Sequence, residues 1–297
     1  MALFKKKTTL VHHIAYMGIM TALNLIFIVL ATYVPLAMLL LILLLPFAST
    51  VVSYYCLKRY YLIYAIASIG LCLVFNVSDT LLYVVPAIAC GFVIGVLLEK
   101  KAHPFWLVLT TTIINAALTY AFIPLINFIG DTDIILAFLT IFGLKDFPYR
   151  TELVFLMIFF MSLIQCSLAH FVLLSDAKKI GIEIDTHIDS FGIYILGLEV
   201  FALLSICFSF FYLPLALVFL AITFYFAALL FFDLMFSKKT AIYLLTATAI
   251  LVGFIVFALL YAKIAKPQAA ILFVIFPLLI GVVSFIKNYL LKYESNI

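Results

Sequence analysis

The stretch His13–Val34, HIAYMGIMTALNLIFIVLATYV, decides the fold. It is long enough to cross a bilayer, which takes about 20 apolar residues. It directly follows the basic cluster Lys5-Lys6-Lys7. Because positive charge beside a first span keeps that end in the cytoplasm, this stretch sets the direction of every span that follows it.

The composition excludes an ordinary water-soluble domain. Of the 297 residues, 68% are hydrophobic and 10% are charged, whereas a soluble domain carries about 25% charged residues. The apolar runs are continuous, which favours helices over the alternating strands of a β-barrel. The sequence therefore predicts an all-α, polytopic membrane helix bundle, placed in the cell (inner or plasma) membrane and surrounded by lipid.

Ten segments have the length and apolarity of membrane spans. They are residues 13–34, 35–57, 61–77, 80–98, 105–130, 151–174, 191–211, 213–236, 240–262 and 268–291. If they alternate in direction from a cytoplasmic N-terminus, 13 of the 17 basic residues fall on the cytoplasmic side. This agreement with the positive-inside rule predicts that both termini are cytoplasmic.

Other function classes are poorly supported. The net charge of +4 comes from short basic pairs at the ends of spans, which is the pattern of orientation signals and not of a nucleic-acid surface. The five cysteines lie in or beside apolar segments without a CxxC pair, so no metal site or other cofactor is predicted. The sequence contains no phosphate-binding loop, H-E-x-x-H motif or G-x-S-x-G elbow, and we predict that the chain is not an enzyme.

Small residues form two stripes at helical spacing. On the first span Ala15, Gly18 and Ala22 share one face, and Asn24 falls on the opposite face. On the fourth span Ala87, Gly91 and Gly95 recur every four residues. Helices in lipid associate at small residues, so each stripe indicates either packing within the bundle or contact with a helix of another membrane subunit.

Polar side chains inside the spans are the candidates for solute binding. Asn24, Asn115, Ser162 and Gln165 fall near mid-membrane on the first, fifth and sixth spans, and Glu199 is the acid placed deepest in any span. Buried polar groups such as these either bridge helices or line a solute cavity. A further set at the predicted outer ends forms either solvated turns or the mouth of that cavity: Asn76, Ser78, Asp79, Tyr83, Tyr120, Asn127, Asp131 and Asp133.

The first six spans resemble the substrate-binding subunits (S components) of energy-coupling factor transporters. The resemblance rests on the basic N-terminus, the motif Ala15-x-x-Gly18-x-x-x-Ala22, the Pro-bounded second span, the short third span, and a fourth span with Pro86, Gly91 and Gly95 that ends in Leu97-Leu98-Glu99-Lys100-Lys101. The whole chain, with its additional spans, resembles more closely the YybS-like (DUF2232) bacterial membrane proteins, which are themselves similar to S components.

The resemblance implies a six-helix module over residues 1–175, a polar cytoplasmic loop over 176–190 and a four-helix extension over 191–297. It also implies that Ala15, Gly18 and Ala22 face a transmembrane coupling subunit, that cytoplasmic ATPases supply energy, and that the substrate site opens outward. The predicted function is capture of a small, vitamin-like solute for uptake.

Two other functions stay open. A stand-alone ten-helix secondary transporter would use Glu199 to couple proton movement. A non-transporting membrane scaffold would recruit partners through the polar loop and the small-residue stripes.

Overall fold

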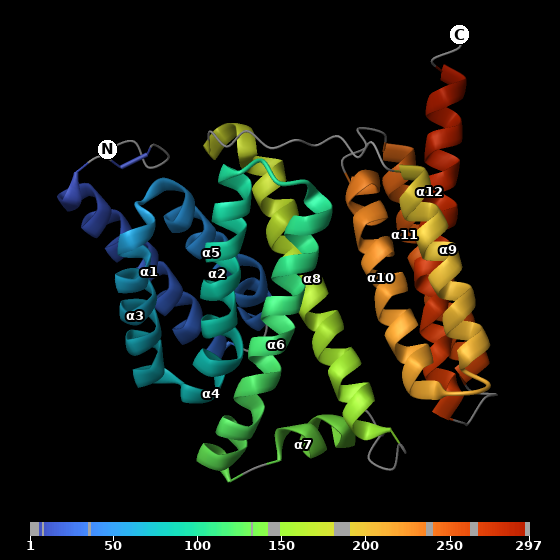
Figure 1. The fold of residues 1–297 in the computed structure, drawn as a ribbon, viewed down its shortest axis with the longest axis horizontal. Coiled ribbons are helices and arrows are strands. Elements are labelled where there is room, and N and C mark those ends of the chain that lie inside the picture. The colour runs from blue at the N-terminus through green and yellow to red at the C-terminus, as the bar shows by residue number, and fades with distance from the viewer. Residues whose placement is uncertain are drawn as a thin grey trace. The chain divides into compact units, whose positions relative to one another are not determined.

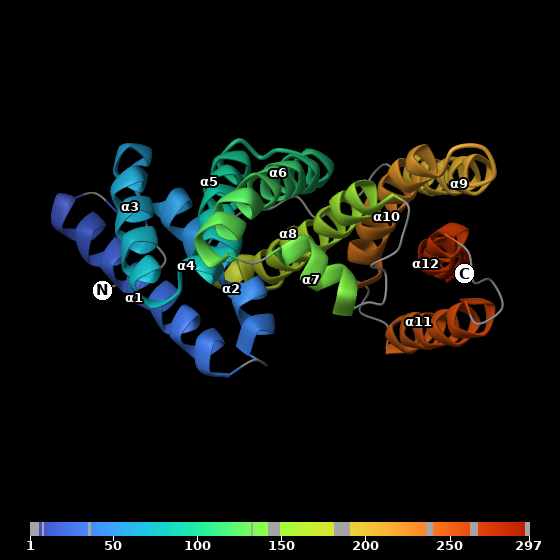
Figure 2. The ribbon, with the colours of Figure 1, turned by 90° about the horizontal axis from the view of Figure 1, so that it is seen from below.

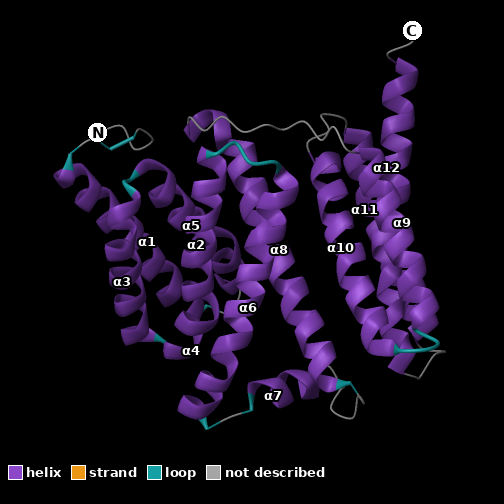
Figure 3. Cartoon of the chain, viewed as in Figure 1, coloured by secondary structure: helices purple, strands orange, loops and turns teal. Residues whose placement is uncertain are grey.

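The structure is a computed structural model of the chain. It describes residues 6–7, 9–34, 37–131, 133–141, 149–180, 191–235, 240–261 and 267–294. Within these residues every regular element is a helix (Figure 3). The predicted all-α class is therefore confirmed.

The chain divides into two compact units, which are described separately. Unit 1 comprises Met1–Phe142 and Met161–Thr186, and unit 2 comprises Gly143–Phe160 and His187–Ile297. The division falls inside the long helix α8 (Arg150–Ile180), so the first part of α8 belongs to unit 2. The predicted loop at 176–190 begins as a continuation of α8 up to Ile180, and residues 181–190 lie outside the described part.

Each unit is a bundle of helices (Figure 1). Apart from its share of α8, unit 1 contains α1 (Leu10–Tyr33), α2 (Ala37–Tyr55), α3 (Lys58–Phe75), α4 (Val77–Asp79), the π-helix η1 (Thr80–Val84), α5 (Val85–Glu99), α6 (Pro104–Gly130) and α7 (Ile134–Ile141). Unit 2 contains α9 (Phe191–Phe208), α10 (Leu213–Met235), α11 (Thr240–Tyr261), the 3₁₀-helix η2 (Pro267–Val274) and α12 (Ile275–Glu294).

Nine helices of the described part are long and apolar enough to cross a membrane. They coincide with nine of the ten predicted spans, and the chain is a polytopic helical membrane protein. The predicted span at 35–57 coincides with α2, a continuous helix that contains Pro46 and is not among the nine. A total of ten spans thus stays a prediction.

The ends of the helices follow local chemistry. The Thr9 hydroxyl accepts a hydrogen bond from the backbone N–H of His12 and caps α1. Pro104 occupies the first position of α6, where its missing N–H costs nothing. Asp131 ends the same helix in the left-handed conformation, with φ 46°.

In unit 1 the closest helix pair is α2 with α5, and small residues make it possible. α5 lies between α2 and α6, while α1 packs against α2 and α3 (Figure 2). A Cβ atom built on Gly91 would meet the backbone nitrogen of Thr50 at 2.8 Å and the carbonyl oxygen of Pro46 at 2.9 Å. On Gly95 it would meet the Ser53 hydroxyl oxygen at 2.5 Å. This face of α5 is therefore filled by α2 of the same chain.

We expect Gly91→Ala to lower the free energy of unfolding by about 1–3 kcal/mol, because the added methyl group collides with backbone atoms that cannot move aside. Gly70→Ala is the matched control, since its Cβ would meet nothing within 4 Å. Alanine there favours the helix by about 0.5–1 kcal/mol. Thermal unfolding in detergent measures both variants, and equal shifts would contradict the close α2–α5 packing.

In unit 2 the α9–α10 pair is held by aromatic packing and one side-chain bond. The Phe226 ring of α10 fills the space above Gly197 of α9, where a Cβ would come within 2.8 Å of the ring. The Ser205 hydroxyl donates to the carbonyl oxygen of Ala216 at 2.9 Å. α12 then packs against α10 and α11.

An ion pair joins the second half of α12 to the end of α10. The Lys287 ammonium contacts the Asp233 carboxylate at 2.7 Å and donates to the Asp233 carbonyl oxygen at 2.7 Å. The two side chains are 8% and 25% exposed. Each group offsets the burial of the other, so removal of one partner strands a charge in a poorly solvated place.

We expect Lys287→Met to lower the free energy of unfolding by about 3 kcal/mol, because it leaves the Asp233 carboxylate without its cation. The double variant Lys287→Met, Asp233→Leu removes both charges and is expected to recover most of this loss. Denaturant unfolding of the three proteins in micelles tests the pair. A double variant as unstable as the single one would show that the charge pairing is not the cause.

Candidate functional site

The inward face of α1 carries a buried cluster of hydrogen-bonded side chains. The Asn24 amide nitrogen donates to the Tyr64 hydroxyl at 2.8 Å, and the Ser49 hydroxyl lies 3.1 Å from the same oxygen. One turn before Asn24, the Thr21 hydroxyl lies 3.0 Å from that of Ser68. All five side chains are buried. We call Thr21, Asn24, Ser49, Tyr64 and Ser68 the α1–α3 polar cluster, since it ties together α1, α2 and α3.

Two neighbouring bonds extend this network to α5. The Tyr61 hydroxyl donates to the carbonyl oxygen of Ile88 at 2.6 Å, and the Ser53 hydroxyl donates to that of Phe92 at 3.0 Å. Hydrocarbon cannot replace such bonds, so they hold helices together. One acceptor of the cluster, Asn24 Oδ1, is buried without a described partner.

A second buried polar group lies between α6 and α8. The Asn115 amide nitrogen donates to Gln165 Oε1 at 2.8 Å. This leaves one acceptor, Asn115 Oδ1, and one donor, Gln165 Nε2, buried without a described partner. The hydroxyl of Thr112, one turn before Asn115, is also buried without a described hydrogen-bond partner. Ser162, one turn before Gln165, is also buried. The Asn115–Gln165 pair thus keeps one unused hydrogen-bond acceptor and one unused donor.

The predicted mid-membrane residues therefore form two groups. Asn24 is bonded to α2 and α3, whereas Asn115 is bonded to Gln165 of α8. α1 packs on α2 and α3, and α6 packs on α5, so the helices between them separate α1 from α6 (Figure 2). The structure brings Asn115 and Gln165 together, and it assigns Asn24 to a different set of partners.

Residues predicted at the outer rim mostly serve local turns. The Asn76 side chain donates to Asp79 Oδ2 at 2.7 Å and accepts from the Asp79 backbone N–H at 3.0 Å, which caps α4. Asn127 Oδ1 accepts from the Ile134 N–H, and Asp133 caps α7 through the Leu136 N–H. Of the remaining rim residues, Ser78 and Tyr83 are half-buried, and Tyr120 and Asp131 are exposed. The solvated-turn interpretation accounts for the bonded residues.

The two small-residue stripes have opposite surroundings. Ala15, Gly18 and Ala22 are exposed on the outer face of α1, and a Cβ on Gly18 would meet nothing within 4 Å. Ala87, Gly91 and Gly95 are buried, and both glycines press against α2. Packing within the bundle therefore explains the stripe on α5, while the stripe on α1 is open.

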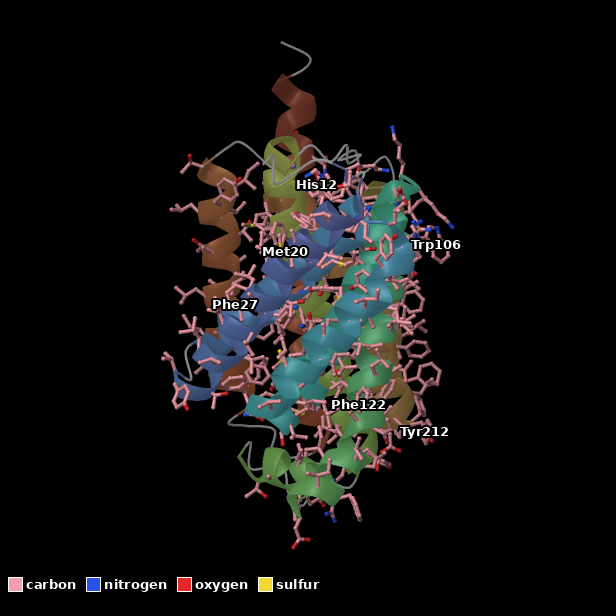
Figure 4. All side chains as sticks on the ribbon, turned by 90° about the vertical axis from the view of Figure 1, so that its left-hand side faces the viewer. His12, Met20, Phe27, Trp106, Phe122 and Tyr212 are labelled. Atoms are coloured by element: carbon pink, nitrogen blue, oxygen red, sulfur yellow. The ribbon has the colours of Figure 1, made fainter. Side chains whose placement is uncertain are left out.

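Three basic segments meet at one end of unit 1. The Glu99 carboxylate accepts from Lys6 at 2.9 Å and from Lys58 at 2.8 Å, and the Lys7 backbone N–H donates to the Tyr55 carbonyl oxygen. The start of α1, the α2–α3 connection and the end of α5 thus share one end. His12 and the exposed Trp106 lie toward that end as well (Figure 4). Four spans that alternate in direction would bring these three segments to the same end of the bundle, as observed. That this end is cytoplasmic stays a prediction.

Glu199 occupies a different setting from the other predicted site residues. It lies on α9 in unit 2, it is exposed, and no described residue of that unit makes a hydrogen bond or ion pair with its carboxyl group. Its neighbours on the helix surface, Leu196 and Leu203, are also exposed. Nothing in the described part of unit 2 makes it part of a solute site.

Metal binding has no support in the described residues, which contain no group of three His, Cys, Asp or Glu side chains placed to hold an ion. No family model, curated protein or solved structure matches the chain. The class of protein that the fold defines is therefore an integral, multi-pass helical membrane protein.

Sequence reasoning missed the hydroxyl groups at the centre of the α1–α3 polar cluster. Tyr61, Tyr64 and Ser68 recur at spacings of three and four in a short span, which places them on one face of a helix. That periodicity is the sequence signal by which these hydroxyl groups could have been found. Ser49 carries a similar signal, because Ser53 follows it four residues later on the same face of α2.

We expect Tyr64→Phe to lower the free energy of unfolding by about 1–2 kcal/mol, because the lost hydroxyl accepts from Asn24 and contacts Ser49. Tyr33→Phe is the control, since Tyr33 is 79% exposed at the end of α1. Thermal unfolding in the same detergent compares the two. If both substitutions have equal effects, the cluster does not contribute to stability.

Proposed function

We propose that this chain is the membrane-embedded substrate-capture subunit of an uptake system of the energy-coupling factor type. It takes a small, vitamin-like solute from the outer side and associates with a transmembrane coupling subunit and cytoplasmic ATPases. The observation that carries the proposal is the open stripe Ala15, Gly18 and Ala22 on a helix whose opposite face is packed against α2 and α3.

The physical argument concerns what small residues do in lipid. Helices there gain little from burying apolar side chains, since lipid is equally apolar, and they associate where backbones approach closely. Gly18 leaves such a close approach available, and no residue of another described helix of unit 1 lies within 4 Å of a Cβ placed there. The Lys6–Glu99 ion pair and the bond from the Lys7 N–H to the Tyr55 carbonyl oxygen join the segment before α1 to the ends of α5 and α2.

The Asn115–Gln165 pair supports the capture of a polar solute. Ligand sites are mostly apolar and place a few polar groups that fix orientation. Here one acceptor and one donor are buried and unused. They match a neutral solute that carries a donor next to an acceptor, as an amide or a heteroaromatic ring with an amino group does.

The test is affinity purification of the tagged full-length chain from bacterial membranes in mild detergent, followed by mass spectrometry of co-isolated proteins and retained small molecules. We expect Gly18→Leu to reduce recovery of the coupling subunit by about tenfold, a loss of about 1.4 kcal/mol, because the side chain blocks close approach. Thermal stability is expected to stay unchanged. Gly70→Leu is the matched control, since Gly70 is equally open on α3.

Asn115→Leu provides the second arm of this experiment. We expect it to abolish retention of the solute while the partner proteins are still recovered, since Asn115 lies on α6 and the open stripe on α1. Wild-type protein that never co-isolates with a coupling subunit or ATPases and retains no small molecule would sink the proposal. Uptake that continues without ATP would favour a stand-alone transporter instead.

A further inference from the structure

Glu199 stands at the centre of a bare helix face. α9 runs from Phe191 to Phe208, so Glu199 is about 12 Å from its start and about 13 Å from its end. The opposite face, with Tyr194, Leu198, Ala202 and Ser205, is buried. Around Glu199 the exposed side chains are apolar: Ile193, Leu196, Val200 and Leu203.

A carboxyl group in this position needs a partner. α9 is one of the candidate membrane spans, and its middle falls in the hydrocarbon. An ionised carboxylate there is costly, and even a protonated one has a donor and an acceptor that lipid cannot satisfy. No described residue of unit 2 forms a hydrogen bond or ion pair with Glu199, so the unit itself does not supply the missing bonds.

A second copy of the same residue satisfies both needs at once. In a pair of protonated carboxyl groups, each O–H donates to the carbonyl oxygen of the other, so the group is its own complement. A twofold axis makes each residue face the same surface of its partner. Because two copies insert in a bilayer in the same orientation, that axis lies along the membrane normal and brings equal depths together.

The spacing of residues on α9 fits a helix pair. Gly192, Leu196, Glu199 and Leu203 follow one another at intervals of four, three and four, which is the seam of a left-handed pair of helices. All four are exposed, and a Cβ on Gly192 would meet nothing within 4 Å. Gly192 therefore permits close approach at one end of the seam.

We propose that α9 pairs with α9 of a second copy of this chain, held at its centre by the two Glu199 carboxyl groups. The interface is self-complementary and independent of the stripe on α1. It concerns the assembly of the chain and does not rest on the proposed uptake function.

Oxidative cross-linking of the full-length chain in membranes tests the pairing. Cys207→Ser is the background, because Cys207 is the exposed cysteine while Cys56, Cys72, Cys90 and Cys166 are buried. In this background Leu203→Cys is expected to give a disulfide-linked dimer with copper–phenanthroline. Ile193→Cys is the matched control: it is 67% exposed against 63% for Leu203, but it lies about 80° around the helix. It is expected to give little dimer.

Substitutions of Glu199 in the Leu203→Cys protein identify the bond. Glu199→Leu suits a lipid-facing surface but removes the hydrogen bonds, and we expect about three- to fifteen-fold less dimer with unchanged thermal unfolding. Glu199→Gln keeps a self-complementary donor and acceptor, and it is expected to retain the dimer. Equal cross-linking at positions 193 and 203, a monomeric Leu203→Cys protein, or a dimer unaffected by Glu199→Leu would each overturn the proposal.

Discussion

The inability of hydrocarbon to hydrogen-bond is the constraint on which this structure depends. A polar side chain within a span must find its partner on a neighbouring helix. Tyr64 shows the consequence, since its hydroxyl binds Asn24 of α1 and Ser49 of α2 and so fixes the rotation of three helices about their axes. With Asn24 turned inward, the opposite face of α1 is left outward, and Ala15, Gly18 and Ala22 are open.

Close backbone packing supplies the second part of the stability of unit 1. Gly91 and Gly95 let α5 approach the backbone of α2, where the dispersion contacts of many atoms accumulate. The stripe on α1 has the same residue types and no such neighbour. Two motifs that look alike in sequence thus have different surroundings, because α2 covers the stripe on α5 and no described helix of unit 1 covers the stripe on α1.

The same constraint separates the charged residues of unit 2. Asp233 and Lys287 neutralise each other, which makes their burial tolerable. Glu199 lies in the middle of its span without such a partner. The burial of Asp233 and Lys287 is offset by their pairing, whereas the carboxyl group of Glu199 has no such partner in unit 2.

The sequence by itself determined the class of protein and the positions of the helices, because hydropathy and length are local properties. The segment predicted at 105–130 became α6 at Pro104–Gly130, and the segment at 213–236 became α10 at Leu213–Met235. It also determined that Asn24 opposes the small residues of α1, because helical angles follow from spacing. Only the tertiary structure decided which helices became neighbours. Asn24 joined Tyr64 while Asn115 joined Gln165, and one stripe was filled while the other stayed open. Those outcomes depend on contacts between distant segments, which no local pattern encodes.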